Sequence, residues 1–128
     1  MITITLPFPP STLNPNYRHK HWSGKAEAIA AYRHECRIEA LDQFDKATGG
    51  LGLRPLRIRD EHPIPATITF VLKDKRRRDM DNLYASLKPA IDSLVDVGLL
   101  PDDDIKSWSP TLRYEQGDKP AVRIELGS

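Results

Sequence analysis

The chain has 128 residues, enough for one domain with a single hydrophobic core and too few for a separate cofactor-binding domain. Its hydrophobic content of 39% and charged content of 29% are typical of a soluble globular protein, and no apolar run is long enough to cross a bilayer. The net charge is +1, but residues 18–21 and 73–78 are basic blocks, whereas residues 102–104 are acidic. This segregation indicates attraction of an anion and binding of a cation.

Cysteine usage and the N-terminus favour the cytoplasm. The single Cys36 cannot form an internal disulfide, which indicates a reducing compartment, and it lies in a helical stretch where we interpret it as a packing residue. The N-terminus shows no signal-peptide pattern. We therefore expect a protein of the bacterial cytoplasm.

In the first half of the chain, alternating apolar residues predict a half-buried strand over residues 2–6, which three prolines end. A loop over residues 7–22 follows. Apolar residues at helical spacing then predict an amphipathic helix over residues 24–46, with Ser23 as its N-cap. Glycines end this helix, and we expect a long surface loop over residues 47–64.

In the second half, alternation predicts a strand over residues 67–72, followed by a helix that Asp81 caps and Gly98 ends. Pro89 falls inside this helix and predicts either a kink or a restart with Pro89 in the first turn. Two final strands are expected over residues 105–114 and 121–126, which makes the order β-α-β-α-β-β.

The strongest functional pattern is the segment 76–83, RRRDMDNL. Asp79 and Asp81 lie two residues apart where a strand gives way to a helix, so their carboxylates can point the same way. Mg²⁺ takes one or two carboxylates and completes its shell with water and substrate phosphate, which the preceding arginines would attract. The alternative is that Asp81 only caps the helix and Asp79 only pairs with an arginine.

Three further features add candidate residues. The acidic residues 102–104 can return to the same pocket, or they can form a solvated turn. Lys88 can stabilise charge on a scissile phosphate, or it can be an ordinary exposed lysine. In the loop 17–22, basic side chains can neutralise phosphates and Tyr17 and Trp22 can stack on bases, or both aromatic rings can pack against the core.

Together these residues resemble the RusA-type Holliday junction resolvases of phages and prophages. The resemblance covers nearly the whole chain and is carried by LPFPPS at 6–11, the segment 76–83, KPAIDSL at 88–94, Gly98 and the aspartates at 102–103. It implies one α+β domain over residues 1–126, with a mixed four-stranded sheet packed against two helices. The last two residues, 127–128, are read as a possible cloning remnant.

The resemblance also implies a function and a site. Members of the family are homodimers that bind four-way DNA junctions and nick two opposed strands symmetrically with Mg²⁺, for which we expect Mn²⁺ to substitute. The catalytic acids and metal ligands match Asp79, Asp81 and Asp103, with Asp103 favoured over its neighbour Asp102. The catalytic lysine matches Lys88 once three residues are inserted, because Ala85 stands at the family's lysine position. The expected DNA-binding residues are Arg18, Lys20, Lys75, Arg76, Arg77 and Arg78.

The mechanism so inferred is metal-assisted hydrolysis of a phosphodiester in branched DNA. Crowding of the three carboxylates would raise the pKa of at least one of them in the absence of metal. Two other functions are compatible with the same residues: a non-catalytic DNA-binding protein, and a metal-dependent hydrolase or transferase acting on nucleotides or sugars. The basic run and the loop 17–22 favour a larger polyanion.

Overall fold

The computed structural model describes residues 2–19, 21–49, 63–74 and 77–127. In this part the protein is an α+β domain with the elements β1 (Ile2–Pro7), η1 (Ser11–Leu13), α1 (Trp22–Ala47), β2 (Ile64–Leu72), α2 (Met80–Ser86), α3 (Lys88–Asp96), β3 (Trp108–Gln116) and β4 (Ala121–Leu126). The expected fold class and element order are confirmed. Most of the expected loop 47–64 lies outside the described residues, as do Lys20, Lys75 and Arg76.

The four strands form one mixed sheet in the order β1-β4-β2-β3. Strand β4 is antiparallel to both β1 and β2, whereas β2 and β3 run parallel. Ile124 of β4 lies opposite Ile4 on one side and Ile68 on the other, and Ile68 is also opposite Leu112. This register places one row of apolar side chains on a single face, since side chains alternate between the two faces of a strand.

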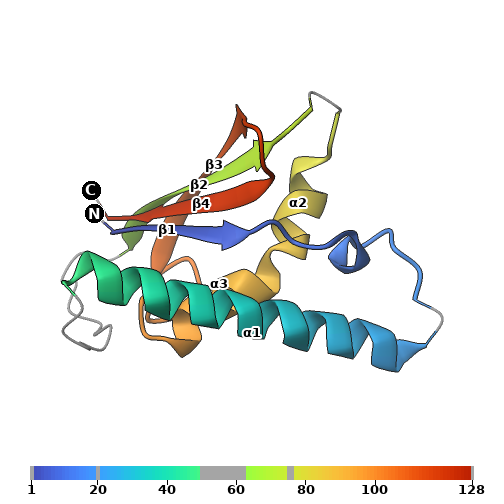
Figure 1. The fold of residues 1–128 in the computed structure, drawn as a ribbon, viewed down its shortest axis with the longest axis horizontal. Coiled ribbons are helices and arrows are strands. Elements are labelled where there is room, and N and C mark those ends of the chain that lie inside the picture. Colours follow the sequence, from blue (N-terminus) through green and yellow to red (C-terminus); the bar gives the residue numbers. More distant parts are fainter. Residues whose placement is uncertain (1, 20, 50–62, 75–76, 128) are drawn as a thin grey trace.

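Two helices cover this apolar face. The long helix α1 packs against β1 and α3 (Figure 1). It contributes Tyr32, Cys36 and Ala40 to the core, while α3 contributes Ala90, Ile91 and Leu94. Cys36 is fully buried, and burial raises the pKa of its thiol to about 12, in keeping with a packing role. None of the described helices combines the length and apolarity that crossing a membrane requires.

The expected second helix is divided at Leu87, so the sheet has three helices beside it instead of two. Helix α3 begins at Lys88 with Pro89 in its first turn. Backbone N–H groups in the first turn have no partner within the helix, so proline costs no hydrogen bond there. The predicted restart is therefore what the structure shows. Gly98 follows the end of α3 with φ of +85°, and the N–H groups of Gly98 and Leu99 bond the carbonyls of Val95 and Leu94.

Several expected boundaries are wrong by two or three residues. Helix α1 begins at Trp22 with His21 as its N-cap residue, so Ser23 lies inside the helix. Strand β2 begins at Ile64 because its N–H bonds the carbonyl of Ser107 and its backbone pairs with Trp108. Residues 105–107 belong to a turn that precedes β3. Pairing between distant segments set the starts of β2 and β3, and local patterns do not contain that information.

Candidate active site

The two aspartates of the RRRDMDNL segment lie at the start of α2. Asp79 is the N-cap residue, with extended backbone angles of −76° and 129°, and Asp81 lies in the first turn. The expectation that Asp81 caps the helix is therefore wrong, and the carboxylate of the N-cap residue Asp79 makes no capping hydrogen bond. Both residues are exposed, and Asp79 accepts a long hydrogen bond of 3.4 Å from the amide of Asn82.

Asp79 lines a groove of about 470 Å³ between the N-terminal segment and α2. One wall comes from residues that follow β1, and the other wall comes from the segment that enters α2. Arg77 and Arg78 stand beside Asp79 in this wall. The lining residues are Phe8, Pro9, Pro10, Ser11, Asn14, Leu72, Arg77, Arg78, Asp79, Asn82, Leu83, Ser86 and Pro120. A groove that combines arginines with a carboxylate suits a phosphate-bearing ligand.

Lys88 lies between two carboxylates from different parts of the chain. Its Nζ donates to Oδ1 of Asp92 at 2.9 Å, one helical turn along α3, and also bonds Oδ2 of Asp103. The bond to Asp103, and after it the bond to Asp92, raises the pKa of Lys88. The bond from Lys88 is the main cause that lowers the pKa of Asp103. Asp103 therefore does not carry the raised pKa that crowding among the three acids would produce.

The structure distinguishes the three consecutive aspartates. Asp104 accepts the N–H groups of Lys106 and Ser107 at 3.1 and 2.8 Å, and so shapes the turn before β3. Asp102 accepts the N–H of Asp103 at 2.8 Å. Asp103 is the one of these three described aspartates that bonds Lys88. The indole N–H of the buried Trp108 donates to the carbonyl of Asp103 at 3.2 Å and so holds the backbone there.

The predicted acids do not form a ready-made metal centre within one protomer. Among the described residues, no three His, Cys, Asp or Glu side chains are placed to hold a metal ion together. Carboxylate oxygens are ligands that Mg²⁺ prefers, and in the structure Asp103 is engaged by Lys88. The metal site shared by Asp79, Asp81 and Asp103 therefore stays a prediction.

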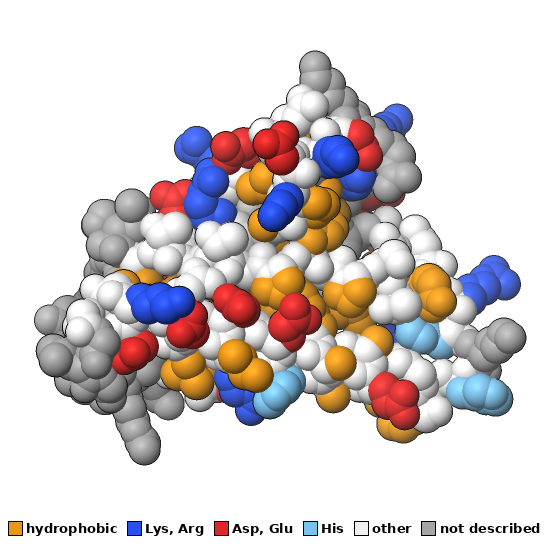
Figure 2. All heavy atoms as spheres, in the orientation of Figure 1, with side chains coloured by type: hydrophobic (Ala, Val, Ile, Leu, Met, Phe, Trp, Pro, Cys, Tyr) orange, Lys and Arg blue, Asp and Glu red, His pale blue; other side chains and the backbone are white. Residues whose placement is uncertain are grey.

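The predicted DNA-binding residues are only partly described. Arg18 and Arg77 are exposed, whereas Arg78 is largely covered and pairs with Asp74 at 3.0 Å. On the face that Figure 2 shows, the described acidic and basic side chains are intermixed. That face therefore shows no separate basic patch among the described residues.

The aromatic residues of the loop 17–22 are exposed instead of packed. Trp22 is 84% exposed at the first position of α1, and Tyr17 is 47% exposed with its ring edge-on to His19 at 4.8 Å. His19 is itself held by a 2.8 Å bond to the carbonyl of Thr12. Of the two alternatives for this loop, the structure favours surface rings that a partner can reach.

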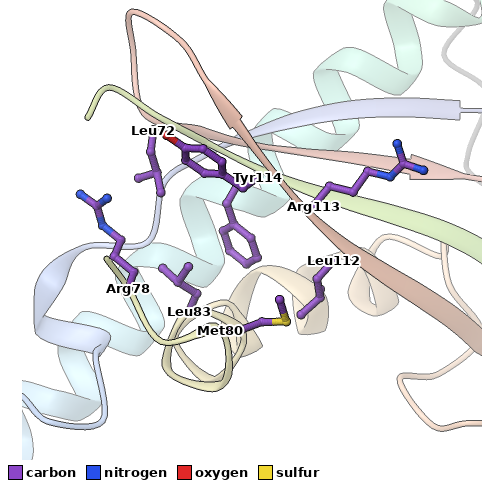
Figure 3. A pocket seen from close by; sticks show the side chains of 8 residues that line it. Leu72, Arg78, Met80, Leu83, Leu112, Arg113 and Tyr114 are labelled. Atoms are coloured by element: carbon purple, nitrogen blue, oxygen red, sulfur yellow. The ribbon is translucent and has the colours of Figure 1, made fainter. Parts of the chain in front are cut away.

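A second, more apolar pocket lies between α2 and β3, with a volume of about 270 Å³ (Figure 3). Met80, Leu83 and Leu112 point into it, and Arg78 and Arg113 lie at its margin. None of the predicted acids lines this pocket. We therefore place the candidate site at the groove of Asp79 and at the Lys88–Asp103 pair.

Sequence reasoning missed two residues next to Lys88. Asp92 lies four residues after Lys88 on a helix, and this spacing, at which side chains meet, is the signal that could have identified it. Tyr84 lies near the same pair: burial is the main cause that raises the pKa of its hydroxyl, and the charge of Asp103 adds to it. No local pattern identifies Tyr84, because its proximity depends on how α2 meets the 102–104 turn.

Comparison with known proteins gives named relatives, although no family model matches the chain. The chain is 37% identical over 102 residues to the crossover junction endodeoxyribonuclease RusA of Shigella sonnei strain Ss046. It is 36% identical over the same length to the protein of that name from Escherichia coli strain K12. In both cases the match covers 79% of this chain and 72% of the relative.

Proposed function

Because the chain belongs to the RusA family of crossover junction endodeoxyribonucleases, we propose that it resolves four-way DNA junctions by two symmetric nicks. The observation that carries this proposal is the similarity over 79% of the chain to crossover junction endodeoxyribonucleases. The groove beside Asp79, with two arginines in one wall, supports a substrate that carries phosphates.

We assign the catalytic roles as the sequence predicted them. Asp79, Asp81 and Asp103 are the proposed ligands of Mg²⁺, for which Mn²⁺ could substitute, and the ion would supply activation of water for hydrolysis. Lys88 is the proposed cation that stabilises charge on the phosphate. For Asp103 to serve as a ligand, it has to exchange Lys88 for another partner.

We further propose that DNA is held by the arginines of this groove together with basic residues that precede them in the chain and basic residues of the loop 17–22. Arg77 and Arg78 line it, and Lys75 and Arg76 precede them in the chain. Arg18 and Lys20 belong to the loop that carries the exposed Tyr17 and Trp22. Cationic side chains beside exposed rings suit a junction, where phosphates are dense and some bases are unstacked.

The experiment that tests the function is cleavage of a synthetic four-way junction with and without Mg²⁺, by the unchanged protein and by Asp81→Asn. We expect the variant to bind the junction and to cut at least about a hundredfold more slowly, because a lost catalytic carboxylate removes roughly 3 kcal/mol of transition-state stabilisation. The matched control is Asp42→Asn, which removes an exposed carboxylate that pairs with Lys46 on α1.

The outcomes separate the competing functions. Junction binding without metal-dependent cutting by the unchanged protein would favour a non-catalytic DNA-binding protein. Competition by small nucleotides but not by branched DNA would favour a hydrolase or transferase with a small substrate. Equal cutting by the unchanged protein and Asp81→Asn would remove Asp81 from the site.

A further inference from the structure

Lys88 has two acidic partners that differ in what else they can do. Asp103 belongs to the turn after α3 and is one of the proposed ligands for the metal ion. Asp92 lies one turn further along the helix that carries Lys88, and its 2.9 Å contact depends only on the geometry of α3. If Asp103 turns to another partner, the contact between Lys88 and Asp92 remains.

The side chain of Lys88 needs such a contact to stay in one place. It is 56% exposed, and a lysine has a flexible four-carbon stem with a compact charge at its end. A lysine released from Asp103 without a second partner would sample many rotamers in solvent. Asp92, 28% exposed, also lies near α1, with Arg33 Nη1 at 4.0 Å from its Oδ2.

We propose that Asp92 is a positioning residue for Lys88: it holds the ammonium group at the acidic turn when Asp103 engages metal or substrate. This inference rests on the proposed function and deepens it. Asp92 does not contact the reacting phosphate; it reduces the number of positions that Lys88 occupies. An exposed ion pair one helical turn apart adds little to stability, so the effect of Asp92 belongs to the rate and not to the fold.

Asp96 on the same helix provides a matched control. Its carboxylate receives two hydrogen bonds from Arg33, at 2.6 and 2.7 Å, which link α1 to α3. In the part of the chain that the structure describes, the carboxylates bonded to Lys88 are those of Asp92 and Asp103. Asp92→Asn and Asp96→Asn therefore remove the same charge from the same helix, and both remove a contact with Arg33, but only the first removes a contact of Lys88.

The test is steady-state cleavage of the four-way junction by these two variants. We expect Asp92→Asn to lower kcat about tenfold with KM changed less than about twofold, because misplacement of a catalytic group affects the chemical step. Asp92→Glu should recover part of the loss, and Asp96→Asn should stay within about twofold of the unchanged protein. In a Lys88→Ala background, Asp92→Asn should cause no further loss.

A second measurement does not depend on activity. In the metal-free protein, the side-chain ammonium resonance of Lys88 in ¹H–¹⁵N NMR should shift or broaden in Asp92→Asn and remain unchanged in Asp96→Asn. An unchanged resonance in Asp92→Asn, equal rates for the two variants, or a further loss in the Lys88→Ala background would each overturn the positioning role. Absence of cutting by the unchanged protein would instead overturn the proposed function, and the role of Asp92 with it.

Discussion

The aspartates at 102–104 show how neighbouring residues of one type acquire different roles. Asp104 shapes a turn and Asp102 bonds the backbone beside it, whereas Asp103 faces a lysine from another helix. A carboxylate that bonds backbone N–H groups is committed to local structure. A carboxylate held by one exposed lysine can exchange its partner, which makes Asp103 the one of the three best suited to chemistry.

Asp96 allows a prediction about acid stability. Hydrogen bonds from Arg33 lower the pKa of its carboxyl, so the folded state favours the charged form more than the unfolded state does. This contribution is present above the ordinary pKa of aspartate and is lost as the pH falls through the lowered value. Because Arg33 is 39% exposed, solvent screening limits the contribution to at most about 1 kcal/mol.

The measurement is thermal unfolding of the unchanged protein and Asp96→Asn between pH 7 and pH 3. We expect the variant to have the lower Tm at pH 7, and the difference to shrink as the pH falls. Asp42→Asn, which disrupts an exposed pair on α1, should change the Tm less. A difference between Asp96→Asn and the unchanged protein that grows towards pH 3 would contradict the assignment.

At the scale of elements, we expect substitution by alanine to have opposite effects on stability at two glycines. Gly98 follows α3 with φ of +85°, a conformation that costs a residue with a Cβ atom about 1–2 kcal/mol. Gly24 lies inside α1, where an added Cβ would make an ordinary 3.6 Å contact with Nδ1 of His19. There, alanine should stabilise the helix by roughly 0.5–1 kcal/mol.

Urea unfolding of Gly98→Ala and Gly24→Ala checks this prediction. The free energy of unfolding should fall for Gly98→Ala and rise for Gly24→Ala. Each variant is the control for the other, since both add one methyl group. A gain in stability for Gly98→Ala would show that this turn does not require the left-handed conformation.

The break at Leu87 also matters at this scale, because it directs the two parts of the expected helix to different tasks. Helix α2, whose N-cap residue is Asp79, lines the groove, whereas α3 buries its apolar face and presents Lys88 and Asp92. Pro89 made a break predictable from the sequence. The position of α3 relative to the 102–104 turn was not predictable, because that position depends on packing of α3 against α1 and the sheet.

For the whole molecule, we predict a homodimer. Two symmetric cuts require two sites related by a two-fold axis, and the described part of one protomer has no three acids placed to share a metal ion. Sedimentation equilibrium should give a mass of twice 14.5 kDa at concentrations at which the junction is cut. A monomer that makes both cuts in one binding event would contradict this prediction.

The sequence by itself determined the α+β class, the element order and the break near Pro89, because hydrophobic periodicity and proline geometry are local properties. Residue patterns also singled out the acids and Lys88, and the comparisons support the family they suggested. Only the tertiary structure decided the strand order, the sorting of the aspartates at 102–104 and the placement of Lys88 between Asp92 and Asp103. These features join segments far apart in the chain, and the contacts between such segments depend on how the whole core packs.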